Sequence, residues 1–512
     1  MIATLSKGTK QMIAVVCVGM ILLFLIFVAI KRDLQQDHLH NVYVGCQNSN
    51  LVVRWELPLI NNAEAVSVCI EGDGYSKEIL LPPHKREFVF EDGNHGKRYS
   101  VTVTELYRDG SMGTPVTKET LCFDESQLPD LPIIRIDTTN NIEPTSDTLD
   151  APEGLSGKTI INNDPVDGVM NYSINQSCTI TSRIQIRLRG NTSSACFEKK
   201  AYSITLDNPV DMLQRGGECT NKEWFLLNTG TSMNEYIGEY LAERCGRNWI
   251  AHMTYVNVVI NGDWKGLYCL AEAYNCPQFR DLVSDDGFLL ENDAYWWKPN
   301  TIFFKVDQIR VTGITVKHPS IKDLNDPRLD ELADFMQAVA DGIGELDEDY
   351  LSFIDTESFI SWIIVKDLMN VVDLTGSNYI FYIDRFDHDN YSNNIITMGP
   401  VWDLSSGMLY ESDSWEFPSQ HIAFLYSSLF QMNGFRSEYK TKWEAVSDGL
   451  SDDFRNEMEE FYSNYGQAIQ ESRMLDSERW NTDVCDLRDE IDYDEALISS
   501  QVSFIDSMIV EW

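Results

Sequence analysis

One uninterrupted apolar segment constrains this chain more than any other feature of its sequence. Residues 12–30 read MIAVVCVGMILLFLIFVAI without a charge, and nineteen residues at a helical rise of about 1.5 Å each nearly match the hydrocarbon thickness of a bilayer. The run is longer than the apolar core of most signal peptides, and no convincing cleavage site precedes Lys31. We expect residues 1–11 to be a cytoplasmic N-terminus and residues 12–30 an uncleaved transmembrane helix; a cleaved signal peptide is the alternative.

Charge does not settle the orientation of this helix, because Lys7 and Lys10 on one side face Lys31 and Arg32 on the other. Cysteine usage is more informative: of the eleven cysteines, all but Cys17 lie outside the apolar run, which leaves an even number. An even set is compatible with disulfides outside the cytoplasm, and ten reduced thiols are the alternative. We predict a single-pass protein of the cell membrane with most of its chain extracytoplasmic.

The charge balance excludes one class of partner. Eighty acidic residues stand against forty lysines and arginines, a formal net charge of -40. Such a chain is repelled by nucleic acid and by anionic membrane surfaces, so we expect neither as a partner. With 512 residues, 43% of them hydrophobic, the chain is long enough to bury two or three separate cores.

The first stretch after the apolar run has the pattern of β-strands. Leu51, Val53 and Trp55 fall on one face of a two-residue period, and about seven such short segments fit between residues 42 and 124. This region resembles a fibronectin type III or immunoglobulin-like β-sandwich, with Trp55 and Tyr99 as core aromatic residues. We predict a spacer or binding module without chemistry of its own.

A polar, proline-punctuated stretch at residues 124–132 is typical of a linker, and a second pattern begins after it. Residues 131–440 mix alternating strands with helical stretches, and residues 441–512 have the pattern of acidic amphipathic helices. The fold class that we predict is α+β, with a helical acidic C-terminal extension.

The segment VVDLTGSNYIFYID places Asp373 and Asn378 five residues apart, between a predicted helix and a predicted strand. Enzymes that transfer phosphate use this Asp-x4-Asn spacing: the acid accepts the proton of the substrate hydroxyl, and the asparagine binds a metal. A hairpin then leads to Asp403 in GPVWDLSSG, where a second metal ligand is expected. Acids that cap turns are the alternative interpretation.

A second group of candidates lies upstream, in RLRGNTSSACFEKKAYSITL. A turn that contains Arg189, Asn191 and Ser193 can bind polyphosphate through backbone N–H groups and a bidentate guanidinium. Lys199 and Lys200 follow, and a lysine that points inward from the next strand needs a carboxylate partner. Glu272 is a candidate for that partner, and an ordinary surface ion pair is the alternative.

Taken together, these segments resemble the spore coat protein H (CotH) kinase family of atypical protein kinases. The resemblance rests on five motifs in the family's order between Leu131 and Tyr410: LPIIRID, RGNTS with KKAYSI, YVNVVINGDWKGLYCLAE, NVVDLTGSNYIFYID and GPVWDLSSG. It implies transfer of phosphate from ATP, with Mg²⁺ or Mn²⁺, to serine or threonine of surface or secreted proteins.

The resemblance also implies roles for individual residues. These are catalysis by Asp373 and Lys200; metal binding by Asn378 and Asp403; and nucleotide contacts by Arg189, Asn191, Ser193, Lys199 and Glu272.

Two departures from the family pattern keep a second hypothesis open. The stretch after EWFLLN reads TGTSMNEYIGEY, with Thr231, Ser232 and Tyr236 in place of an acid and an Arg-Asn pair, and Ser405 stands where a second acid is common. The alternative is a non-catalytic surface or adhesion protein with the same fold. A carbohydrate-active enzyme that uses Trp296 and Trp297 is a third class, although no pair of carboxylates has a spacing that supports it.

Overall fold

The structure, a computed structural model, describes residues 39–47, 49–58, 62–155, 158–162, 164–175, 178–216, 219–247, 249–273, 277–308, 312–371, 374, 377, 379–404, 407, 425–510 and 512. The apolar segment 12–30 lies outside this set. Within the described ranges, no helix combines the length and the apolar character that crossing a membrane requires. The chain divides into unit 1, Met1–Leu128 with Ile260–Trp264, and unit 2, Pro129–Val259 with Lys265–Trp512.

Unit 1 is all-β in its described residues before Pro129, apart from a short 3-10 turn at Glu125–Gln127. One antiparallel sheet has the order β1-β2-β5 and the other the order β4-β3-β6-β7. The strands are β1 (His40–Gln47), β2 (Asn50–Glu56), β3 (Ala63–Gly72), β4 (Tyr75–Leu81), β5 (Glu87–Phe90), β6 (Lys97–Tyr107) and β7 (Val116–Cys122). Leu51, Val53, Trp55 and Tyr99 are all buried. The prediction of a β-rich N-terminal region is confirmed, whereas its assignment to fibronectin type III stays a prediction.

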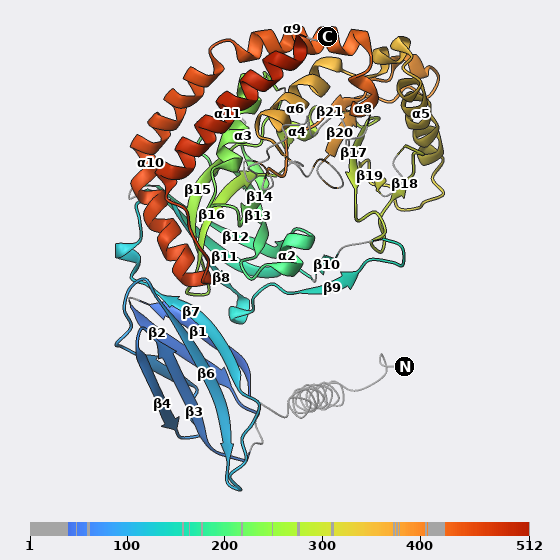
Figure 1. Ribbon diagram of the computed structural model, residues 1–512. Helices are drawn as coiled ribbons and strands as arrows, with labels where there is room; N and C mark the ends of the chain where they lie inside the picture. Colours follow the sequence, from blue (N-terminus) through green and yellow to red (C-terminus); the bar gives the residue numbers. More distant parts are fainter. Residues whose placement is uncertain are drawn as a thin grey trace, which may run out of the picture. The chain divides into compact units, whose positions relative to one another are not determined.

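Unit 2 contains a closed barrel of seven strands in the order β11-β12-β13-β14-β16-β15-β8 (Figure 1). They are β8 (Ile133–Thr138), β11 (Val166–Asn175), β12 (Cys178–Arg189), β13 (Ala201–Val210), β14 (Asn221–Leu227), β15 (Met253–Ile260) and β16 (Asp263–Glu272). A separate hairpin pairs β9 (Ser146–Asp150) with β10 (Lys158–Asn162), after a 3-10 turn at Thr139–Asn141. Two helices interrupt the barrel strands: α2 (Thr192–Cys196) follows β12, and α3 (Asn234–Arg244) joins β14 to β15.

The second half of unit 2 has a five-stranded sheet in the order β18-β19-β17-β20-β21, together with several helices. The strands are β17 (Phe288–Asp293), β18 (Phe303–Phe304), β19 (Gly313–His318), β20 (Tyr379–Ile383) and β21 (Thr397–Met398). The helices are α4 (Pro277–Arg280), α5 (Pro327–Gly344), η4 (Glu348–Phe353), α6 (Thr356–Leu368), η5 (Tyr391–Asn393), α8 (Tyr426–Leu429), α9 (Asn433–Ser447), α10 (Leu450–Trp480) and α11 (Leu487–Ile509). The predicted α+β class is confirmed.

Local sequence explains where the longer helices begin. Asp326 accepts a hydrogen bond from the backbone N–H of Arg328, and Pro327 occupies the first turn of α5. Asp355 caps α6 in the same way through Ser358. Helices α10 and α11 lie side by side (Figure 1), and their apolar residues belong to the same continuous core as the barrel and α6.

Candidate functional site

Several predicted site residues cannot be compared with the structure. Asp373 and Asn378 lie outside the described residues. Ser193 lies in α2, but its side chain is not among those described. Their proposed roles therefore stay predictions. The remaining candidates, Arg189, Asn191, Lys199, Lys200, Glu272 and Asp403, all have described positions in unit 2.

Arg189 and the segment that contains Asp403 come together at one end of the barrel. Arg189 is the last residue of β12, and its guanidinium lies 4.1 Å from the centroid of the Phe225 ring and 5.1 Å from that of Trp402. Trp402 directly precedes Asp403. Stacking of a guanidinium on aromatic faces is favourable and fixes its direction, so two distant motifs of the sequence share one place in the fold.

A carboxyl group that the sequence did not single out belongs to the same place. Burial raises the pKa of the Glu235 carboxyl, in the first turn of α3, and the negative charge of Asp403 raises it further, to about 7. The positive charges of Lys366 and Arg189 lower the pKa of Glu235 and so offset part of this rise. Two carboxyl groups whose charges repel each other offer the oxygen donors that Mg²⁺ and Mn²⁺ prefer, and a bound cation would offset that repulsion. The residues present therefore fit a divalent metal.

A buried lysine holds the backbone that presents Asp403. The Nζ atom of Lys366, in α6, donates hydrogen bonds to the carbonyl oxygens of Trp402 at 2.5 Å and Asp403 at 3.1 Å. Asp403 itself has a φ of 53°, in the left-handed region that few residues other than glycine adopt. The lysine thus stabilises an otherwise unfavourable backbone conformation, and this conformation sets the direction of the Asp403 side chain.

A small pocket opens beside this cluster, between α3 and the chain around Trp402. Its lining includes the carboxylate residues Glu235 and Glu239, and it is otherwise mostly apolar: Leu227, Gly238, Ala242, Ile250, Ala251, Met253, Ala271, Val401, Trp402 and Leu404.

Asn191 lies in the loop after Arg189 and is held on two sides. Its Oδ1 atom accepts hydrogen bonds from Thr159 Oγ1 at 2.8 Å and from Lys298 Nζ at 2.5 Å. Lys298 follows β17, so this bond connects the predicted phosphate-binding loop to the five-stranded sheet. The amide of Asn191 therefore orders the loop through protein contacts.

Strand β17 adds two acids to the part of the sheet next to that loop. Glu291 and Asp293 are two residues apart on a buried strand and lie on the same face. Lys317 Nζ lies 2.5 Å from a carboxylate oxygen of Glu291 and 3.9 Å from one of Asp293. Ser377 Oγ donates to Asp293 Oδ1 at 2.9 Å, so a residue next to Asn378 in sequence reaches this acidic strand. Two acids at a period of two in FLLEND are a sequence signal that could have identified them.

Lys199, rather than Lys200, has the buried carboxylate partner that an inward lysine needs. Its Nζ donates to Asp476 Oδ2 at 2.6 Å and to the carbonyl oxygen of Leu267 at 2.7 Å. Both charged side chains are largely buried, at 11% and 4% exposed. A Cβ on Gly266, whose φ is +119°, would overlap the Asp476 carboxylate, so only glycine allows this approach.

The predicted pairing of Glu272 with the inward-pointing lysine, whether Lys200 or Lys199, is wrong. Lys200 Nζ instead donates to the carbonyl oxygens of Ser194 at 2.6 Å and Phe197 at 2.5 Å. Glu272 is buried at the end of β16, where Arg215 lies at 3.4 Å and the N–H of His252 donates to it at 3.2 Å. The partner that sequence reasoning missed, Asp476, is 277 residues from Lys199 along the chain, and no local motif reports such a contact.

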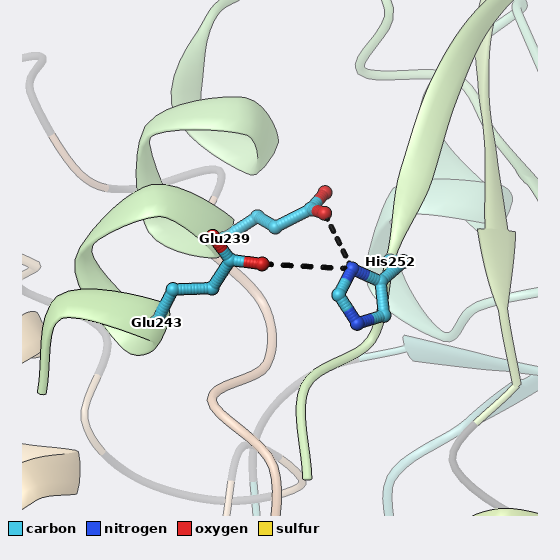
Figure 2. A group of neighbouring side chains, drawn as sticks. All are labelled: Glu239, Glu243 and His252. Atoms are coloured by element: carbon cyan, nitrogen blue, oxygen red, sulfur yellow. Dashed lines mark hydrogen bonds and ion pairs between the residues drawn. The ribbon is translucent and has the colours of Figure 1, made fainter. Parts of the chain in front are cut away.

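A mixed nitrogen and oxygen group lies near Glu272 (Figure 2). Glu239 and Glu243 are four residues apart and so share one face of α3, opposite His252, the residue directly before β15. His252 Nδ1 lies 2.6 Å from Glu239 Oε1 and 4.0 Å from Glu243 Oε1. The other Glu239 oxygen accepts the N–H of Met253 at 3.1 Å. These contacts tie β15 to α3.

The stretch that departs from the family pattern has structural roles here. The side-chain amide of Asn234 donates to the carbonyl oxygens of Leu404 and Gly407, both at 2.9 Å. The hydroxyl of Tyr236 donates to Glu457 on α10 at 2.5 Å. The start of α3 is therefore joined both to the segment after Asp403 and to the C-terminal helices.

The comparisons with known proteins identify the family. A family model described as CotH kinase protein matches residues 186–494, more than half of the chain. The chain belongs to the CotH kinase protein family. The match includes Arg189, Glu235, Lys366, Asp403 and Asp476.

Curated proteins give no match. Among solved structures, the chain is similar to the twitchin kinase region from C. elegans (Fn31-NL-kin-CRD-Ig26), with 8% sequence identity and a TM-score of 0.19. The alignment covers 67% of this chain and 62% of that one, so the chain spans less than two thirds of that structure. A TM-score this low supports no conclusion about fold or activity.

Proposed function

We propose that this protein is a membrane-anchored, extracytoplasmic kinase of the CotH type, which transfers phosphate from ATP to serine or threonine of surface or secreted proteins. Family membership supports the chemical class. The observation that supports the proposal is the grouping of Arg189, Glu235, Lys366 and Asp403, because it brings cationic side chains and carboxyl groups that could serve phosphate and metal into one part of the fold.

We assign each residue a separate role in this reaction. Asp403 and Asn378 would hold a divalent metal, with Glu235 as a further carboxyl group, and such a metal would supply positive charge to the phosphates. Asp476 and the carbonyl oxygen of Leu267 accept two of the three ammonium protons of Lys199. Lys199 contacts phosphate through the third. Arg189 neutralises charge that develops during transfer, and Asp373 accepts the proton of the attacking hydroxyl.

One observation favours the alternative of a non-catalytic binding protein. The Arg189 guanidinium is stacked on Phe225 and Trp402, and the amide oxygen of Asn191 is already bonded to Thr159 and Lys298. Both groups are thus engaged by the protein itself. In this alternative, the protein uses the same fold to bind or adhere at the cell surface without transferring phosphate.

The decisive experiment uses full-length protein purified in detergent, labelled ATP, Mg²⁺ or Mn²⁺ and a serine-rich acceptor. We expect transfer that falls by about 100-fold or more in Asp403→Ala and in Asp373→Asn. Asp330→Ala, an exposed acid on α5, is the matched control and keeps wild-type activity. Label that persists in both site variants contradicts the assignment, and a calorimetric titration without nucleotide binding favours the binding protein.

A further inference from the structure

Two cysteines of unit 1 face each other across the interior of its two sheets. Cys46 belongs to β1 and Cys122 ends β7, and their sulfur atoms lie 3.5 Å apart. Strand β1 is part of the three-stranded sheet and β7 part of the four-stranded sheet. A covalent bond between these sulfurs would therefore join the two sheets directly.

The surroundings leave the two thiols facing each other. Cys46 Sγ donates to the carbonyl oxygen of Phe123 at 3.0 Å, and Cys122 Sγ donates to that of Ser49 at 3.1 Å. Both side chains are buried, at 4% and 0% exposed. A Cβ on Gly93 would crowd Cys122 Sγ, so the backbone closes the space on that side as well.

Other described cysteines have different surroundings. Cys245 and Cys269 are buried in unit 2, where burial raises the pKa of each thiol and makes it unreactive. Cys178 Sγ accepts a hydrogen bond from Gln214. Within the described part of the chain, a sulfur-to-sulfur contact is recorded for Cys46 and Cys122 alone.

We propose that Cys46 and Cys122 form an intramolecular disulfide that locks the two sheets of unit 1 together in the mature protein. The bond requires the sulfurs to approach from 3.5 Å to about 2.05 Å, which side-chain rotation can supply. The thiolate of one cysteine attacks the disulfide of a thiol oxidant, which forms a mixed disulfide and releases one oxidant thiol. The second cysteine then attacks the first cysteine's sulfur in that mixed disulfide and releases the other oxidant thiol, so the oxidant is reduced as the Cys46–Cys122 bond forms.

This inference rests on the proposed extracytoplasmic placement but not on phosphate transfer, so the two can fail separately. The bond would close a loop between residues 76 apart, from the first strand of the sandwich to the last. Cross-links that close long loops restrict the unfolded chain most, so a large effect on unit 1 is expected.

The test compares full-length protein from its native compartment with the same chain made in a reducing cytosol. Denatured, unreduced protein is alkylated, digested and analysed by mass spectrometry. We expect Cys46 and Cys122 to be linked in the first sample and alkylated in the second, with Cys245 and Cys269 alkylated in both. Alkylation of Cys46 and Cys122 in the first sample overturns the proposal.

A stability measurement gives a second, independent readout. Reductant should lower the thermal midpoint of unit 1 in the wild-type protein, by on the order of 10 °C. It should leave the midpoint of the Cys46→Ser/Cys122→Ser double variant unchanged. Cys69→Ser, a half-buried cysteine on β3, is the control and should respond to reductant as the wild type does. Equal responses of the wild type and the double variant also overturn the proposal.

Discussion

Unit 1 fills its interior mainly with apolar side chains, whereas unit 2 also encloses many charged ones. Among the described residues of unit 1, buried ionisable groups other than cysteine and tyrosine are confined to Glu105 and to Asp263 in the Ile260–Trp264 turn. Among the described residues of unit 2, the buried charged ones are Lys265, Glu272, Glu291, Asp293, Lys366, Asp367, Arg473, Asp476, Arg479 and Asp494.

The difference matters because a buried charge is destabilising unless it is paired. Unit 1 avoids this cost, as a spacer or binding module can. Unit 2 compensates it at Lys199 through the Asp476 carboxylate, and at Lys366 through hydrogen bonds to the backbone carbonyl oxygens of Trp402 and Asp403. Buried charge therefore separates the part of the chain that has candidate chemistry from the part that does not. Four substitutions test this contrast.

The largest effect is expected in the buried ion pair. Asp476→Ala leaves the Lys199 ammonium buried without its carboxylate and should lower the free energy of unfolding of unit 2 by about 3–5 kcal/mol. Urea denaturation, followed by a probe in unit 2, measures this loss. The double variant Lys199→Met/Asp476→Leu should recover much of it, because no charge is left unpaired. A loss below about 1 kcal/mol in the single variant would show that the pair is open to water.

The next effect depends on pH. Burial first, and then the negative charge of Glu490, raises the pKa of Asp494 to about 8. The folded protein therefore holds this proton more tightly than the unfolded chain does. The resulting stability is fully present below the unfolded pKa near 3.8 and is lost as pH rises through 8.

Asp494→Asn removes this dependence. It should match the wild type near pH 4 and exceed it by about 2–4 kcal/mol at pH 8 to 9, with a slope of up to about 1.4 kcal/mol per pH unit. Asp489→Asn, on the exposed side of the same helix, is the control and should show no such change. Parallel stability profiles for the wild type and Asp494→Asn would contradict the assignment.

In unit 1 the sensitive positions should be apolar. Val103→Ala in β6 removes two methyl groups from a side chain with no exposure, and we expect a loss of about 2 kcal/mol in thermal or chemical unfolding. Val89→Ala, at a β5 position that is 38% exposed, provides the comparison and should cost much less. Equal losses of stability at the two positions would mean that burial of apolar side chains does not stabilise this sandwich.

The smallest effect is expected for a surface ion pair of unit 1. Arg54 and Glu87 approach to 2.6 Å but are 44% and 49% exposed. Glu87→Gln should cost about 0.2–1 kcal/mol, and the difference should shrink in high salt because solvent screens both charges. A loss as large as that of Asp476→Ala, insensitive to salt, would remove the contrast between the units.

Local patterns predicted the secondary structure better than they predicted its assembly. Alternation at Leu51, Val53 and Trp55 was enough to identify strands, because side-chain period reports burial directly. Closure of the barrel was not predicted, since it depends on pairings such as β14 with β16 that join segments separated by a helix and another strand. The shared core of α10 and α11 with the barrel also arises from distant contacts.

The candidate site shows the same limit. Motifs located Arg189 and Asp403, because each follows or precedes a recognisable strand in the family's order. The sequence did not identify Glu235, Lys366 and Asp476, because each is defined by its neighbours in the fold. Glu235 is influenced by the charge of Asp403, Lys366 is bonded to two backbone carbonyl oxygens, and Asp476 is paired with the buried Lys199. Glu272 was assigned the wrong partner for the same reason, since a pairing of charges is a property of the fold.

The ion pair of Lys199 and Asp476 has a consequence for how the chain is made. The two residues are 277 positions apart, and synthesis at about 5–20 residues per second separates their appearance by roughly 14–55 s. During that interval the barrel strands exist without the carboxylate that neutralises their inward lysine. Completion of this part of the fold must therefore wait for α10, and a chain interrupted before that helix would leave Lys199 without its carboxylate partner.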